Sequence, residues 1–466
     1  MDKWLSAALE YVPQWLDFQM EQAEAPGCSL AIARDGKVIF EKVFGSADLR
    51  AKTPLTPRHR FRVASHSKSF TAAGVMLLRE RKKLTLDDEA GRYVSGLHKS
   101  IAGATIAQLL SHGAGILRDG PDTGQWTHRR PFLNEKELRA DLTLPPTLPA
   151  SERFKYSNHG YGLLGLIIEA VAGESWRDFI AREVVKAAGL KDTYPDAPVP
   201  RGVPLATGHS TKMLLGERFT IPTDQSTHAM AAATGFVSTA RDLALFFNQL
   251  APQAKRSILS AASRREMTRR LWRNPHASLE GYYGLGIISG STGGWDWFGH
   301  SGGFPGTITR TTTIPSRGIT VSVLTNSADG YAAGWGDGVI QILRRFEKDG
   351  APRAALKKWS GRWWSLWGAL DLVPVGEKVL VATPGFFNPF LDAGEITVGA
   401  RNRGALTLAH GYGSHGEPAE LVTGRGGKAK EVVLAGSRLL SRAAAEREAR
   451  AKFRAGRTRG ATARRA

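Results

Sequence analysis

The chain has 466 residues, of which 42% are hydrophobic and 23% charged, and this composition excludes a wholly disordered or fibrous protein. Its length predicts two or three structural units, since single domains usually hold about 100–200 residues. The formal net charge of +20 favours anionic partners, but residues 442–466 hold nine Lys or Arg against two Glu, so much of the charge belongs to one terminal segment.

The N-terminal residues 1–27 predict an amphipathic helix with several acidic residues, and they show no basic start, apolar run or small-residue cleavage site. We therefore expect a cytoplasmic protein. No stretch reaches the roughly 18–20 apolar residues of a membrane span, so none is expected. Cys28 is the only cysteine, which excludes an intramolecular disulfide and fits a reducing compartment.

Residues 28–45 predict a β-hairpin, because Asp35-Gly36 separates two apolar runs. Ser65–Leu78 has apolar residues at helical spacing and predicts a helix with Ser65 at its start. Further helices are expected at 105–111, 135–141, 160–172, 175–188, 239–250 and 334–350. Strands are expected at 295–299, 307–315 and 318–326, where β-branched residues dominate.

Strands at both ends of this region with helices between them predict an α+β fold, in which an antiparallel sheet is flanked by helices and carries a helical lobe. We expect this domain to span 1–347, followed by a polar linker at 348–358. Short β segments with glycine turns then predict a small all-β barrel or sandwich at 359–440. Its tryptophans, Trp359, Trp363, Trp364 and Trp367, are expected to pack rather than to form a ligand platform.

The basic tail of 441–466 has two interpretations. It could tether the protein to nucleic acid or to another acidic surface, but an Ala/Arg-rich terminus is more often a solvated helix that frays. We favour the second interpretation and expect no nucleic-acid partner. The sequence predicts no oligomeric state.

Ser65 and Lys68 form the only Ser-x-x-Lys in the chain, and at this spacing on a helix both side chains lie on one face. A lysine amine whose pKa is lowered by burial can take the proton of a serine hydroxyl. An isolated Ser-x-x-Lys is nevertheless a weak signal, because a capping serine with a solvated lysine has the same pattern. Two further motifs strengthen it.

Tyr156-Ser157-Asn158 is the only Tyr-x-Asn and precedes a predicted helix. The tyrosine can move a proton to a leaving group, and the amide can hold the lysine or a substrate. The third motif is Gly299-His300-Ser301-Gly302-Gly303 at a predicted strand edge, where glycines allow a substrate backbone to come close. We expect the N–H groups of Gly303 and Ser65 to form an oxyanion hole.

In this order the three motifs resemble the β-lactamase and penicillin-binding-protein superfamily. The resemblance covers about residues 25–345 and extends to stretches such as ERFKYSNHGYGLLGLIIEAVAGESW and FGHSGGFPGTITRTTTIPSRGITVSVLTNS. It is strongest for the branch that holds class C β-lactamases, family VIII esterases, D-aminopeptidases and related S12-type D-peptidases. The small β domain resembles the barrel-like accessory domains of D-aminopeptidases.

The resemblance implies that Ser65 is the nucleophile, Lys68 its activating partner, Tyr156 the general base and acid, and Asn158 a contact for lysine and substrate. His300 stands where class C β-lactamases have lysine, and a histidine there can be partly charged. We therefore expect small ester or D-amino-acid peptide substrates, with an acyl-enzyme at Ser65, rather than β-lactams. An acyltransferase with the same acyl-enzyme and a non-catalytic ligand-binding protein remain alternatives.

No cofactor is expected. His112 and His159 lie near the motifs, but their spacing does not indicate a metal site, and we interpret both as structural. Cys28 is interpreted as a buried small hydrophobe and not as a nucleophile.

Overall fold

The computed structural model describes the chain except for residues 213–215, 275–280, 410–412 and 454–466. It divides into two compact units, Met20–Asp337 and a second unit that joins Met1–Gln19 to the residues from Gly338 onward. The division falls inside helix α1 (Lys3–Gln22) and helix α11 (Ala332–Asp349). The segment predicted as a linker, 348–358, contains the end of α11 and most of the 3-10 turn η7 (Ala354–Trp359).

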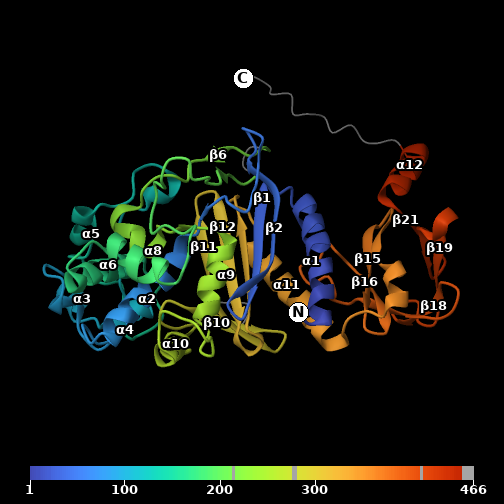
Figure 1. Cartoon of the computed structure of the whole chain (residues 1–466). Coiled ribbons are helices and arrows are strands. Elements are labelled where there is room, and N and C mark those ends of the chain that lie inside the picture. The colour runs from blue at the N-terminus through green and yellow to red at the C-terminus, as the bar shows by residue number, and fades with distance from the viewer. Residues whose placement is uncertain (213–215, 275–280, 410–412, 454–466) are drawn as a thin grey trace, which may run out of the picture. The chain divides into compact units, whose positions relative to one another are not determined.

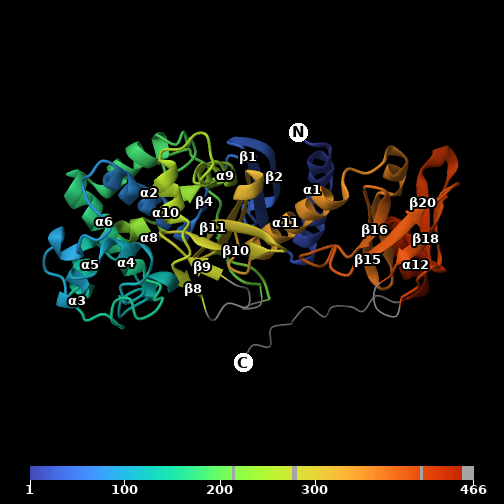
Figure 2. The ribbon, with the colours of Figure 1, turned by 90° about the horizontal axis from the view of Figure 1, so that it is seen from below.

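A nine-stranded antiparallel sheet lies at the centre of the unit Met20–Asp337, in the order β3-β2-β1-β13-β12-β11-β10-β9-β8 (Figure 1). Its strands are β1 (Gly27–Arg34), β2 (Lys37–Asp48), β3 (Thr53–Pro54), β8 (Trp272–Arg273), β9 (Gly281–Tyr283), β10 (Ile288–Thr292), β11 (Trp295–Phe304), β12 (Thr307–Ile314) and β13 (Ile319–Thr325). Strands β8 to β11 follow one another toward one edge (Figure 2).

The predicted hairpin is confirmed and explains how the sheet begins. Asp35 and Gly36 have φ of 49° and 80°, as a two-residue turn with both central residues in the left-handed region requires. β1 then pairs with β13 from the far end of the unit, with Cys28 opposite Thr325. The prediction that both ends of this region build one antiparallel sheet is therefore confirmed.

Helices cover the sheet and form the predicted helical lobe. α9 packs against β1 and β13, whereas α2, α6 and α8 pack against one another beside the sheet (Figure 1). The ring of Phe70 on α2 stacks on Phe236 and Phe246 at centroid distances of 4.1 and 3.9 Å, which joins α2 to α9. The helices are α2 (Ser67–Glu80), α3 (Lys99–Ala102), α4 (Ile106–Leu110), α5 (Glu135–Asp141), α6 (Asn158–Ala172), α7 (Trp176–Ile180), η4 (Ala181–Lys186), α8 (Ala231–Thr234), α9 (Ala240–Gln249) and α10 (Ala261–Met267).

Two short sheets complete this unit. β4 (Phe61–Arg62) pairs with β7 (Val237–Ser238), and β5 (Gly208–His209) pairs with β6 (Thr220–Ile221). The first of them fixes the chain immediately before the Ser-x-x-Lys motif.

The predicted small all-β domain is a closed eight-stranded barrel in the second unit. Trp364 on the first strand pairs with Leu440 on the last, which closes it. Its strands are β14 (Gly361–Ser365), β15 (Gly368–Val375), β16 (Lys378–Ala382), β17 (Gly394–Val398), β18 (Arg403–Leu408), β19 (Pro418–Thr423), β20 (Ala429–Leu434) and β21 (Ser437–Leu440).

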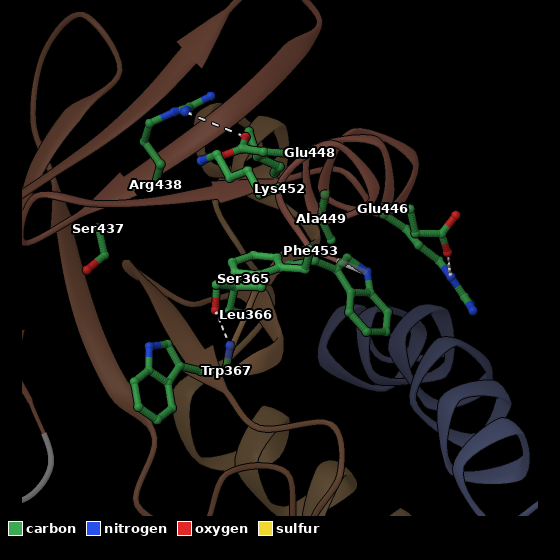
Figure 3. Close-up of a pocket in the computed structure, with 14 residues that line it drawn as sticks. Ser365, Leu366, Trp367, Ser437, Arg438, Glu446, Glu448, Ala449, Lys452 and Phe453 are labelled. Carbon is green, nitrogen blue, oxygen red and sulfur yellow. Dashed lines mark hydrogen bonds and ion pairs between the residues drawn. The ribbon is translucent and has the colours of Figure 1, made fainter. Parts of the chain in front are cut away.

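The tryptophans of the barrel do not all pack as expected. Trp359 and Trp363 are buried in the barrel core, but the side chain of Trp367 is almost fully exposed at the turn between β14 and β15. Trp367 and Leu366 line a surface pocket with Phe453, which follows helix α12 (Arg442–Lys452) (Figure 3). The expectation of packing is therefore wrong for Trp367, because alternation along β14 ends before this turn residue.

None of the helices in the described part of the chain is long and apolar enough to cross a membrane. Of the predicted basic tail, residues 442–452 form the exposed helix α12, and residues 454–466 lie outside the described ranges.

Candidate active site

Ser65 lies in a tight 3-10 turn, η1 (Ala64–His66), directly before α2. Ala64 has a φ of 45°, in the left-handed region that a non-glycine residue adopts only when its surroundings impose it. Ser67 holds this turn, since its hydroxyl donates to the carbonyl of Ala64 and accepts from the N–H of Phe236 at 3.0 Å. The half-buried Ser65 hydroxyl is therefore presented by a fixed backbone.

The Lys68 amine reaches Ser65, as the Ser-x-x-Lys spacing predicts. Its Nζ lies 3.2 Å from Ser65 Oγ, 2.7 Å from Asn158 Oδ1 and 2.9 Å from the carbonyl oxygen of Ala233. The side chain is fully buried, and burial lowers the pKa of Lys68 well below its ordinary value. The amine is thus both within hydrogen-bond reach of the serine and shifted toward the neutral form that can accept a proton.

The Tyr156 hydroxyl is the second group on the serine, with its oxygen 2.9 Å from Ser65 Oγ. Burial raises the pKa of Tyr156, so the phenol keeps its proton at neutral pH. The ring also lies under Lys68, whose Nζ is 4.7 Å from the ring centroid. The first two motifs therefore meet at one hydroxyl group.

The Tyr-x-Asn motif is rigid because it forms the start of α6. Ser157 caps the helix by accepting the N–H of Gly160 at 2.9 Å, and its hydroxyl donates to the carbonyl of Leu117 at 2.6 Å. Asn158 is the first residue of the helix. Its side-chain oxygen accepts a hydrogen bond from Lys68, and its side-chain nitrogen donates one to Asp119 Oδ1 at 2.5 Å.

The third motif lies on β11 and approaches the serine from the sheet. A side chain at Gly302 would place its Cβ 2.2 Å from the carbonyl oxygen of Val63, so only glycine lets β11 come this close to the segment before Ser65. Gly303 is exposed and Ser301 half-buried. The expected pairing of the Gly303 and Ser65 N–H groups as an oxyanion hole stays a prediction.

His300 is buried rather than open to solvent. Its Nε2 lies 3.1 Å from the hydroxyl of Tyr283, and its Nδ1 lies 3.0 Å from the N–H of Ser301. Burial, with a smaller effect of His66, lowers the pKa of His300 well below its usual value. The expectation of a partly charged His300 is therefore wrong, and the ring is neutral at neutral pH.

The interpretation of His112, His159 and Cys28 as structural groups agrees with their surroundings. The ring of His112 lies tilted against that of Tyr156 with 4.2 Å between ring centroids, and its Nδ1 accepts the N–H of Ser157 at 3.1 Å. His159 Nε2 pairs with Asp141 at 2.8 Å. Burial raises the pKa of the Cys28 thiol.

Several residues of the site were not predicted from the sequence. Tyr161, whose ring lies 5.5 Å from Lys68 Nζ, follows Asn158 by one helical turn, and this spacing could have revealed it. Tyr283, Asp119 and the Ala233 carbonyl come from other parts of the chain, so no local spacing marks them.

The chain matches the Beta-lactamase family over residues 12–342. It is 33% identical over 180 residues to penicillin-binding protein 4* of Bacillus subtilis strain 168, which covers 37% of this chain and 38% of that protein. It is 30% identical over 182 residues to protein flp of Staphylococcus aureus strain MW2, covering 38% and 36%. The chain therefore spans less than two fifths of the length of these curated relatives.

Solved structures share the fold over a larger part of the chain. The octameric penicillin-binding protein homologue from Pyrococcus abyssi is 25% identical with a TM-score of 0.64, covering 93% of this chain and 99% of that one. A D-stereospecific amidohydrolase from Streptomyces sp. (24%, TM-score 0.57, covering 68% and 94%) and EstCE1, a hydrolase with promiscuous acyltransferase activity (22%, 0.58, covering 73% and 98%), show the same fold. Since the family match spans most of the chain and its fold agrees, the chain belongs to the beta-lactamase family, whose members and structural neighbours include hydrolases.

Proposed function

We propose that this protein is a serine hydrolase that forms an acyl-enzyme at Ser65 and cleaves ester or amide bonds of small substrates, including peptides of D-amino acids. The observation that carries the proposal is that Ser65 Oγ lies 3.2 Å from Lys68 Nζ and 2.9 Å from the Tyr156 hydroxyl. A nucleophile with a base and an acid at hydrogen-bond distance is the arrangement that acyl transfer requires.

The directions of the pKa shifts divide the two roles. Lys68, with a lowered pKa, takes the proton as Ser65 Oγ attacks the carbonyl carbon. Tyr156, with a raised pKa, remains a phenol and donates its proton to the leaving group, and the proton that Lys68 took from Ser65 balances this loss. Backbone N–H groups at Ser65 and Gly303 would stabilise the oxyanion. Water then attacks the acyl-enzyme.

The neutral, buried His300 favours ester and peptide substrates over β-lactams. A lysine at this position would offer a positive charge to a carboxylate, whereas His300 offers only a ring nitrogen that already lies beside Tyr283. The fold shared with an amidohydrolase and with EstCE1 supports the same substrate classes.

The test uses a p-nitrophenyl acyl ester and D-alanyl p-nitroanilide as substrates, with mass spectrometry for an adduct on Ser65. We expect turnover of at least one substrate and an acyl adduct in wild type, and neither in Ser65→Ala. Equal rates in the two proteins with no adduct would exclude the enzyme and favour a ligand-binding protein. A burst that turns over only after an alcohol or amine is added would indicate an acyltransferase.

A further inference from the structure

Arg118 is held against the Tyr-x-Asn motif by its own backbone. Its carbonyl oxygen accepts the N–H groups of Asn158, at 2.8 Å, and His159, at 3.2 Å. The preceding carbonyl, of Leu117, accepts the hydroxyl of Ser157. These bonds fix the Cα of Arg118 relative to the residue that hydrogen-bonds the serine, Tyr156.

The side chain of Arg118 lies beside the reacting groups but remains open to solvent. Its Cζ is 5.6 Å from the centroid of the Tyr156 ring, and 64% of the side chain is exposed. Burial is the largest effect on the pKa of both Tyr156, which it raises, and Lys68, which it lowers; the charge of Arg118 acts on both with a smaller, lowering effect, so its field reaches both groups on the serine.

Most of the guanidinium is available to a ligand. An arginine has five N–H donors, and Arg118 uses Nε, which lies 3.0 Å from Asp119 Oδ2. Within the ranges that the structure describes, no protein acceptor engages its two Nη groups. Two parallel N–H donors match the two oxygens of a carboxylate.

Asp119 is less available to bind a positively charged group of a substrate. Its Oδ1 accepts from Asn158 and its Oδ2 faces Arg118, while only 9% of its side chain is exposed. A substrate ammonium would have to break one of these contacts and would lie near Arg118 and Lys68. Of these two adjacent residues, the one with free hydrogen-bonding capacity is therefore the cation, Arg118.

We propose that Arg118 binds a carboxylate of the substrate and makes the enzyme selective for small esters or amides that carry a negative charge near the scissile bond. This inference rests on the proposed hydrolase function. The charge comes from the loop between α4 and α5, beside Tyr156, and not from the position of His300 on β11. The ligand chemistry is that of a carboxylate, on either the acyl group or the leaving group.

The experiment compares kcat/KM for two pairs of esters with wild type, Arg118→Gln and Arg118→Lys. The first pair is the mono-p-nitrophenyl ester of adipic acid against p-nitrophenyl hexanoate, which places the charge on the acyl group. The second pair is the butyryl ester of 4-hydroxybenzoate against that of 4-hydroxybenzamide, which places it on the leaving group. The readout is the ratio of the charged to the neutral substrate within each pair.

In wild type we expect a preference of about ten- to hundredfold for the charged member of at least one pair, as a charge-assisted hydrogen bond gives. Arg118→Gln should lose this preference mainly through a higher KM for the charged ester, and Arg118→Lys should keep part of it. The wild-type preference should also fall as salt is raised.

Arg92 provides a matched control. It is equally exposed, pairs with Asp88 at 2.9 Å, and lies 5.6 Å from the ring of Tyr93, but it contacts none of the three motifs. Arg92→Gln makes the same change in net charge and should leave both ratios as in wild type. Equal ratios in wild type and Arg118→Gln, or an equal loss in Arg92→Gln, would overturn the proposal.

Failure of the hydrolase function itself is recognised separately. Calorimetry measures the binding of both ester pairs, which remain intact, to Ser65→Ala and to the double variant with Ser65→Ala and Arg118→Gln. Charge-selective binding that depends on Arg118, without turnover by wild type, would support the carboxylate site and reject the hydrolase. Turnover without any charge preference would support the hydrolase and reject the site.

Discussion

Replacing Lys68 by methionine tests the proposed base directly. Methionine keeps the length and apolar character of the side chain but removes the amine, and with it the contacts to Ser65, Asn158 and the Ala233 carbonyl. General bases contribute about 10²–10⁴ in rate, so we expect kcat to fall by this factor, or about 3–5 kcal/mol in the activation free energy.

The loss should be catalytic rather than structural. Two buried acceptors, Asn158 Oδ1 and the Ala233 oxygen, would lose a donor at about 1–3 kcal/mol each, but the cost of burying an amine disappears at the same time. We therefore expect the free energy of unfolding to change by less than about 3 kcal/mol, as measured by urea titration.

The pH profile makes the test specific. A base works when it is unprotonated, so the rate should rise with pH through the pKa of Lys68, and this rise should lie below the ordinary lysine value of 10.5. The assay is steady-state hydrolysis of a p-nitrophenyl ester, with Lys42→Met, an exposed lysine on β2, as control. A kcat for Lys68→Met within tenfold of wild type, or the same acidic limb in its residual activity, would refute the reasoning.

Three further predictions concern stability. Burial lowers the pKa of His66 from 6.5 to about 3, so the folded state binds fewer protons in this window. His66 should therefore contribute about 1.4 kcal/mol per pH unit to the fall in the free energy of unfolding as pH decreases, beside the contributions of the buried His112 and His300, and a slope in His66→Gln equal to that of wild type would contradict this. Gly302→Ala should lower the melting temperature and the activity, because its Cβ would lie 2.2 Å from a backbone oxygen. Gly303→Ala should leave the melting temperature unchanged, because the nearest neighbour of its Cβ would be 3.6 Å away. In a denaturant titration, Trp359→Ala should lower the free energy of unfolding by about 3–5 kcal/mol, and Trp367→Ala should lower it by less than about 0.5 kcal/mol. Similar losses for the two variants would reject the assignment of Trp359 to the barrel core.

The elements that local patterns could predict are those whose side chains alternate or repeat clearly. Asp35-Gly36 marked the first hairpin, and the β-branched runs marked β12 and β13, because these strands are long and buried. β8 and β9 hold only two and three residues, which is too short for a period to appear. The sequence did not predict β14, because the spacing of its tryptophans indicated packing but not a strand.

The site divides in the same way. Lys68 and Asn158 were found because each stands at fixed spacing from a reactive residue in its own motif, and the structure brings them within 2.7 Å of each other. Tyr283 and Asp119 reach the site only through pairing of distant elements. The sequence could not predict the neutral state of His300 either, because this state follows from burial and not from residue type.

Asp119 and Arg118 act on the pKa of Lys68 in opposite directions, and this gives a paired prediction for the proposed base. Burial has the largest effect and lowers the pKa of Lys68; the carboxylate of Asp119 raises this pKa, and the guanidinium of Arg118 lowers it further. Asp119→Asn should therefore move the acidic limb of the pH–rate profile to lower pH, and Arg118→Gln should move it to higher pH.

Because the two substitutions lie on adjacent residues of one loop, a general disturbance of this loop would shift the two limbs in the same direction or lower the rate without shifting either. Opposite shifts are what charge alone predicts, and added salt should reduce the shift from the exposed Arg118 more than that from the buried Asp119. Shifts of the same sign would contradict the prediction that the charges of Asp119 and Arg118 set the pKa of Lys68 in opposite directions.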